Sequence, residues 1–110
     1  MKRLIISLAL LVLPMSSFAN YDANFVGKIT HVLTYTHSDE LLIRVEGQPT
    51  SHPKCTYLDY LAVDTSIPAE RRQVVLSRIL LAYASGTPVN IGYDSKDECA
   101  GSRIKIYRVG

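Results

Sequence analysis

The chain has 110 residues, which suffices for one small domain, and 47% of them are hydrophobic. Its twelve basic and ten acidic residues give a formal charge of +2, and two of the basic residues, Lys2 and Arg3, lie in a predicted leader. Without that leader the chain is formally neutral, which argues against nucleic acid as a partner because phosphate backbones select basic surfaces.

The first nineteen residues have the order of a secretory signal peptide. Lys2 and Arg3 precede an apolar run over residues 4–13, and Pro14 ends that run. Ser17 and Ala19 place small side chains three and one residues before a cleavage point, so we predict cleavage after Ala19 and a mature domain over residues 20–110. The alternative, a transmembrane anchor, needs roughly twenty apolar residues, about twice what this run offers. We therefore expect an exported protein, periplasmic or secreted, without a membrane anchor after cleavage.

Three strands are predicted in the first half of the mature chain. Apolar and polar residues alternate over 25–35, and again over 41–46 after a short polar turn at 37–39, which predicts a hairpin. A loop rich in Gly, Pro and Ser covers residues 47–53. Residues 55–63, rich in Tyr and Leu, then predict a third strand.

One helix of about eighteen residues and two further strands complete the prediction. Pro68 suits a first helical turn, with Thr65 or Ser66 as its cap, Glu70 suits the positive end of the helix dipole, and Gly86 ends the helix. Alternating residues over 89–93 and 104–109 predict the last two strands, with a loop over 94–102 between them. Three strands, a helix and two strands is the chain order of the OB-fold, a five-stranded barrel with a helix between strands three and four.

The predicted helix carries apolar residues on two sides. One side is expected to face the barrel and comprises Val75, Leu76, Ile79, Leu80 and Tyr83. On the opposite side, Val74 and Leu81 are seven residues apart and therefore aligned, with Arg71 and Arg78 beside them. Isolated apolar residues are common on solvated surfaces. The aligned pair also fits contact with other subunits, so these four residues are candidates for an oligomer interface.

The chain has two cysteines, Cys55 and Cys99, both in the predicted mature part. An even count in an exported chain predicts one disulfide. Closing a loop of this length stabilises a domain by roughly 4 kcal/mol in the chain-entropy model. A reactive thiol is the alternative, but neither cysteine has a CxxC partner or a basic neighbourhood of the kind that lowers a thiol pKa.

Few residues have a pattern typical of catalysis or metal binding. His31, His37 and His52 lack zinc-ligand spacing, and we expect them to be structural or at the surface. The acidic loop residues Asp94, Asp97 and Glu98 lack the regular spacing of a calcium loop, which favours a solvated turn. Ser66 and Ser77 have no nucleophile motif around them. We therefore predict a protein that is not an enzyme and has no cofactor.

Tyrosine is unusually frequent, with seven residues in the chain and no Trp. Exposed tyrosines stack on sugar rings and hydrogen-bond to sugar hydroxyls, although packing in the core or at a barrel rim explains most tyrosines in small β-proteins. Both interpretations remain open from composition.

Several short stretches resemble the binding subunit of subtilase cytotoxin and related small exported proteins. They are Phe25-Val26-Gly27 followed by Ile29-Thr30, Val45-Glu46-Gly47-Gln48, Cys55, and residues 80–93, LLAYASGTPVNIGY. The resemblance implies a pentameric ring of OB-folds that binds sialylated glycans through the barrels, while the helices line a pore that receives a toxic subunit. It also implies ligand contacts at Tyr93 and Gln48. Val26 occupies the position of a serine in that family.

Two functions therefore remain open for the chain. The first is an exported, non-catalytic binding subunit, oligomeric, that recognises a glycan or a partner protein. The second is a monomeric periplasmic envelope or stress protein that uses the same small barrel to bind a protein or a small ligand. The size of the native protein would separate them.

Overall fold

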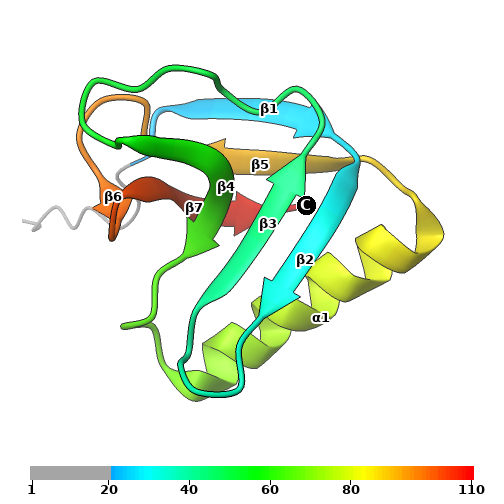
Figure 1. Ribbon diagram of the computed structural model, residues 1–110. Coiled ribbons are helices and arrows are strands. Elements are labelled where there is room, and N and C mark those ends of the chain that lie inside the picture. The colour runs from blue at the N-terminus through cyan, green and yellow to red at the C-terminus, as the bar shows by residue number, and fades with distance from the viewer. Residues whose placement is uncertain (1–20) are drawn as a thin grey trace, which may run out of the picture.

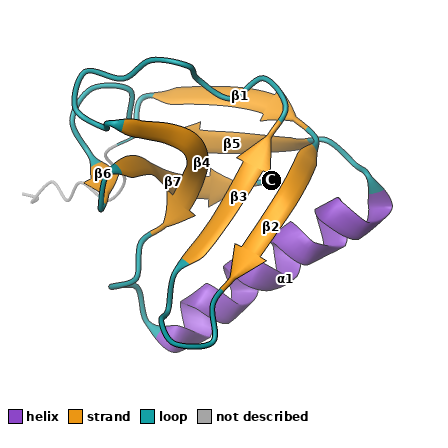
Figure 2. Ribbon diagram, viewed as in Figure 1, coloured by secondary structure: helices purple, strands orange, loops and turns teal. Residues whose placement is uncertain are grey.

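The computed structural model describes residues 21–110, and the predicted signal peptide lies outside this range. Its elements in chain order are β1 (Ala23–Gly27), β2 (Ile29–Thr34), β3 (Leu41–Val45), β4 (Tyr57–Val63), α1 (Ala69–Ser85), β5 (Val89–Tyr93), β6 (Cys99–Ala100) and β7 (Arg103–Val109). The domain is thus mainly β, with one helix (Figure 2).

The strands form one curled sheet in the order β1-β5-β7-β4-β3-β2, with β6 paired to β7. All pairings are antiparallel except that of β4 with β7, which is parallel. Figure 1 shows β2, β3 and β4 crossing over the layer of β1, β5 and β7. Because β1 and β2 are consecutive in the chain, the two ends of the strand order meet, and the sheet has the shape of a half-barrel.

The predicted strand count of five is wrong, because the structure has seven strands. The segment predicted as one strand over 25–35 is divided at Lys28 into β1, which pairs with β5, and β2, which pairs with β3. The short strand β6 lies within the predicted loop 94–102. The helix consequently follows the fourth strand and not the third, while the other predicted strands agree with β3, β4, β5 and β7 to within two residues.

Gly27 explains why the first segment bends there. A Cβ atom on Gly27 would lie 2.0 Å from the carbonyl oxygen of Glu46, so only glycine permits this close approach of the two chains. Just beyond, the register of β2 against β3 shifts between Ile29 and His31. This bulge turns Ile29 and Val32 toward the core and leaves His31 exposed, so the predicted uniform alternation along the segment is broken.

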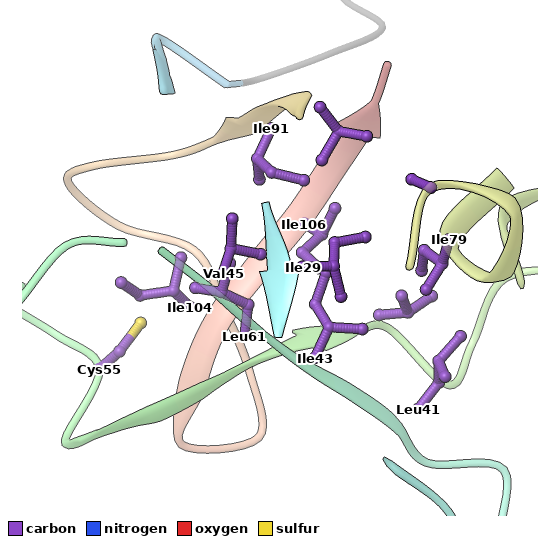
Figure 3. Close-up of a cluster of buried hydrophobic side chains, with 13 residues drawn as sticks. Ile29, Leu41, Ile43, Val45, Cys55, Leu61, Ile79, Ile91, Ile104 and Ile106 are labelled. Atoms are coloured by element: carbon purple, nitrogen blue, oxygen red, sulfur yellow. The ribbon is translucent and has the colours of Figure 1, made fainter. Parts of the chain in front are cut away.

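The core fills the space between the curled sheet and the helix (Figure 3). Alternate residues of β3, Leu41, Ile43 and Val45, point into it and meet Ile79 from the helix and Ile91 from β5. Branched aliphatic side chains dominate this core, consistent with their preference for pleated, half-buried surfaces.

The helix spans 17 residues, one fewer than predicted, and ends as expected at Gly86, which has a left-handed φ of 69°. Its start differs from the prediction. The N-cap is Pro68, and no side chain caps the helix. Ser66 instead donates from its N–H and hydroxyl to the carboxylate of Asp64. The preceding turn is therefore stabilised by an Asp–Ser pair and not by a helix cap.

The core-facing side of the helix is narrower than predicted. Ile79 and Ala82 are buried and Val75 and Leu76 are partly buried, but Leu80 and Tyr83 remain 45% and 46% exposed. The predicted burial of Leu80 and Tyr83 is thus wrong. The helix packs mainly on β2 and to a lesser extent on β7. Only the helix side chains that face these two strands are therefore buried.

Candidate functional site

Cys55 and Cys99 form a disulfide, which confirms that prediction; their Cα atoms are 5.7 Å apart. The bond joins Cys55, two residues before the start of β4, to the short strand β6. It therefore fixes the loop over 94–102 against the end of the loop that leads into β4.

His52 reinforces the same junction. Its Nδ1 accepts hydrogen bonds from the backbone N–H groups of Lys54 and Cys55, both at 3.0 Å, so its Nε2 carries the proton and donates to the carbonyl of Asp94 at 2.9 Å. The potential ligand atoms of His52, Cys55 and Cys99 lie within 4.8 Å of one another. With the two sulfurs bonded to each other and both imidazole nitrogens hydrogen-bonded within the protein, this cluster has a structural role.

The acidic loop is organised around Asp94. Its buried carboxylate accepts hydrogen bonds from the backbone N–H groups of Lys96, Asp97 and Glu98, at 2.9, 3.4 and 3.2 Å. Asp22 supports the same loop through Ser95, whose backbone N–H and hydroxyl both bond to it, and these bonds lower the pKa of Asp22. The carboxylate of Asp94 thus orders its own loop in the manner of an Asx turn, and Asp22, just before β1, holds the same loop from a distant part of the chain.

Gln48, one of the two candidate ligand residues, uses its whole side-chain amide within the protein. Oε1 accepts a 2.8 Å hydrogen bond from the N–H of Val45, and Nε2 donates to the carbonyls of Leu58 and Asp59 at 3.2 and 3.1 Å. Gln48 therefore joins the end of β3 to the first half of β4. These contacts give it a structural function in the free protein.

Tyr93, the other candidate, lies at the end of β5 and is half-buried. Its ring meets Phe25 edge-on, with ring centroids 5.9 Å apart, and packs against the core. None of the hydrogen bonds of the described residues joins Tyr93 to Gln48, which contacts β3 and β4 instead. The structure therefore gives these two residues different surroundings.

The outer face of α1 carries the predicted interface candidates. Val74 and Leu81 are 67% and 71% exposed, and Arg71 and Arg78 are exposed beside them. Leu80 and Tyr83 add further apolar surface on the same helix. The unburied side of α1 is thus more apolar than expected for a solvated helix.

A groove that was not predicted from the sequence lies on the outer face of the sheet, and we call it the sheet groove. It has a volume of about 330 Å³ and lies between β3, β4, the start of β7 and the turn from β6 to β7. Leu42 and its cross-strand partner Ala62 line it; both are buried, although neither belongs to the main hydrophobic cluster between the sheet and the helix. The polar or aromatic residues around them are Glu40, Tyr57, Asp64, Ser102 and Arg103.

Tyr57 and Arg103 form one wall of the sheet groove. They are opposite one another in the parallel pairing of β4 with β7, and the guanidinium carbon lies 5.4 Å from the centre of the Tyr57 ring. Asp59 holds this guanidinium through two hydrogen bonds of 3.1 and 3.2 Å, which lower the pKa of the Asp59 carboxyl. Tyr57 itself remains 59% exposed.

Asp64 lies at another edge of the groove. Burial raises the pKa of its carboxyl, but hydrogen bonds from Ser66 and Lys105 outweigh burial, so the pKa is lower than usual. The groove thus combines an apolar floor, an exposed aromatic ring, carboxylate acceptors and a guanidinium. The high Tyr content was the one sequence signal of this site, but it does not tell which tyrosine is exposed.

No helix among residues 21–110 is both long and apolar enough to cross a membrane. Comparisons with family models, curated proteins and solved structures gave no match to the chain.

Proposed function

We propose that the chain is an exported, non-catalytic binding module of the OB-fold type, which recognises a glycan in the sheet groove. The observation that carries the proposal is the exposed ring of Tyr57 at the edge of a groove with an apolar floor and polar walls.

The strand pairing supports the OB-fold assignment. If β1 and β2 count as the two halves of one bent strand, and β6 as part of a loop, the order becomes that of a five-stranded barrel with its helix between strands three and four. OB-folds bind oligosaccharides and oligonucleotides on the face of strands two and three, between the loops that follow strands one and four. In this chain β3, β4, Glu40 and the turn from β6 to β7 occupy that region.

The chemistry of the groove favours a sugar over a nucleic acid. A tyrosine ring stacks on the apolar face of a pyranose. Carboxylates accept hydrogen bonds from sugar hydroxyls, and a guanidinium donates hydrogen bonds to sugar oxygens. The carboxylates of Glu40 and Asp64 would repel a phosphate backbone, and the mature chain has no excess of basic residues.

The exposed apolar surface of α1 supports an oligomer as part of this proposal. Val74 and Leu81 would lose their contact with water in a helix-to-helix interface. The long side chains of Arg71 and Arg78 would still reach water, because their charged ends extend beyond the apolar contact. The resemblance noted above implies a pentamer with a partner subunit. A native mass of one chain would instead support the monomeric envelope protein.

The experiment is a glycan array that carries sialylated and neutral oligosaccharides, probed with the purified mature protein. The strongest binder is then titrated calorimetrically against variants. We expect Tyr57→Ala to weaken binding by about tenfold or more, since stacking on an aromatic ring contributes on the order of 1–2 kcal/mol. Tyr57→Phe keeps the stacking surface and is expected to lose much less.

Two control variants make this result specific. Tyr83→Ala removes a similarly exposed tyrosine from α1 and should leave the affinity unchanged. Tyr93→Phe removes the hydroxyl to which the resemblance assigns a sugar contact. If Tyr93→Phe weakens binding and Tyr57→Ala does not, the sheet groove is not the glycan site. If the native protein binds no glycan, the proposed ligand class is wrong.

A further inference from the structure

A second groove, which we call the edge groove, runs along β7 on the side that faces the first half of α1. It has a volume of about 340 Å³ and is lined by all five residues from Lys105 to Val109. Side chains of successive strand residues point to opposite faces of a sheet. A groove that touches five successive residues therefore follows the backbone edge of the strand and not one of its faces.

This edge of β7 is unpaired over its second half. β4 pairs with β7 only at Tyr57–Arg103 and Ala62–Lys105, and beyond Lys105 the described pairings of β7 are with β5 alone. The N–H of Gly110 donates to the carbonyl of Asn90 on β5, at 2.8 Å. Backbone groups of neighbouring strand residues point in opposite directions, so the N–H and C=O of Val109 point to the free edge.

The opposite wall of the edge groove is apolar, and its rim is basic. Val63, Ile67 and Val75 supply the apolar wall. Arg71 and Arg108 also line the groove, and neither forms an ion pair among residues 21–110. Lys105 is different, because Asp64 and Glu98 lie 3.2 and 3.5 Å from its ammonium group and neutralise it.

We propose that the edge groove binds an extended acidic peptide segment of a partner protein, which adds to the free edge of β7 as a further strand. Backbone hydrogen bonds to an exposed edge provide affinity in this mode, and alternate side chains provide specificity. Apolar residues of the segment would contact Ile67 and Val75, and acidic residues would pair with Arg71 and Arg108. The edge groove shares Val63 and Asp64 with the sheet groove but does not include its Tyr57 wall, and the proposal does not depend on glycan binding.

The test uses a fluorescent heptapeptide of alternating valine and glutamate, with fluorescence anisotropy as the measurement. We expect saturable binding to the purified protein. A peptide with lysine in place of glutamate should bind at least about tenfold more weakly, because it places like charges against both arginines. If neither peptide binds at protein concentrations up to about 1 mM, the proposal is wrong.

Methylated peptides test the strand geometry. In an extended peptide the N–H groups of alternate residues point to the same edge, so methylation of the valine nitrogens and methylation of the glutamate nitrogens block opposite edges. One methylated peptide should lose binding by about tenfold, and the other should keep it. Equal affinity of the two would show that the peptide does not bind as an added strand.

Charge-reversed variants test the location. Arg71→Glu with Arg108→Glu should weaken binding of the valine–glutamate peptide by at least about tenfold. Arg44→Glu, a charge reversal at an exposed position of β3 that does not line the edge groove, should have little effect. Sedimentation of the protein without peptide tests the other possible occupant of the edge groove, a second copy of this chain. A dimer that Arg108→Glu alone abolishes would show that a second copy of this chain occupies the edge, and it would overturn the assignment to a partner peptide. Arg71→Glu is left out of this measurement because Arg71 is also a candidate for the helix interface.

Discussion

The carboxylate of Asp59 on β4 and the guanidinium of Arg103 on β7 are joined by two hydrogen bonds of 3.1 and 3.2 Å. This pair crosses the boundary where β4 and β7 run parallel. It also orients the guanidinium that lies over the ring of Tyr57. The wall of the sheet groove therefore depends on a pair of charges outside the core.

The Asp59–Arg103 pair predicts a component of stability that is lost in acid. The hydrogen bonds from Arg103 lower the pKa of Asp59 in the folded protein relative to its ordinary value of 3.8. The pair therefore stabilises the fold fully above this value, and the contribution disappears as the pH falls through the lowered pKa. Asp59→Asn should lack this component, which is at most about 1 kcal/mol for so exposed a pair. The free energy of unfolding of the native protein and of Asp59→Asn is measured by urea denaturation at pH 7 and at pH 2. If the two proteins differ in stability by the same amount at both pH values, the prediction is wrong.

The Cys55–Cys99 disulfide predicts a large loss of stability on reduction. It closes a loop between residues 44 apart in sequence, for which the chain-entropy model gives about 4 kcal/mol. The double variant Cys55→Ala, Cys99→Ala should unfold at a much lower urea concentration than the oxidised protein. Thiol titration under native conditions gives the complementary check, because two free thiols per chain would mean that the bond does not form.

We expect replacement of Gln48 to lower the stability of the fold. Gln48→Ala would leave the N–H of Val45 and the carbonyls of Leu58 and Asp59 without their side-chain partner. We expect a loss of roughly 1–3 kcal/mol in the free energy of unfolding. Thr50→Ala, an exposed change in the same loop, is the matched control. If Gln48→Ala leaves stability intact and only weakens glycan binding, its role is ligand contact and the structural interpretation fails.

We expect the exposed side chains of Val74 and Leu81 to form part of a subunit interface. Replacing both with Ser should reduce the mass measured by light scattering at micromolar concentration and leave the circular dichroism spectrum unchanged, since neither side chain belongs to the core. Gln73→Ser with Ala84→Ser changes two exposed positions of the same helix as a control. A native mass of one chain would exclude the ring, and an oligomer that tolerates Val74→Ser with Leu81→Ser would exclude this face from its interface.

Local sequence patterns predicted most of the elements. Period-two alternation located β3, β5 and β7, and the Tyr and Leu content of residues 55–63 located β4. Pro68 and Gly86 marked the limits of α1. The division between β1 and β2 was not predictable, because it depends on the approach of Glu46 to Gly27, a contact between distant segments. The exposure of Leu80 was not predictable either. Its helical spacing matches the core-facing residues, but its side chain lies outside the part of α1 that contacts the sheet.

The candidate site was less predictable than the fold. Gln48 was selected by resemblance, but its hydrogen bonds to two strands exist only once β3 and β4 have paired. Tyr57 lies in a segment with Tyr60 and two leucines, and composition cannot tell which of these side chains is exposed. Its position opposite Arg103 follows from the parallel pairing of β4 with β7, which joins residues 46 positions apart.

Chemical-shift mapping shows residue by residue whether a glycan binds in the sheet groove. The isotope-labelled mature protein is titrated with the strongest binder from the glycan array, and backbone amide shifts are recorded. We expect the largest shifts at four residues that line the groove, Tyr57, Ala62, Ser102 and Arg103. Shifts concentrated instead around Tyr93 and Phe25, with Tyr57 and Arg103 unchanged, would mean that the glycan does not bind in the sheet groove.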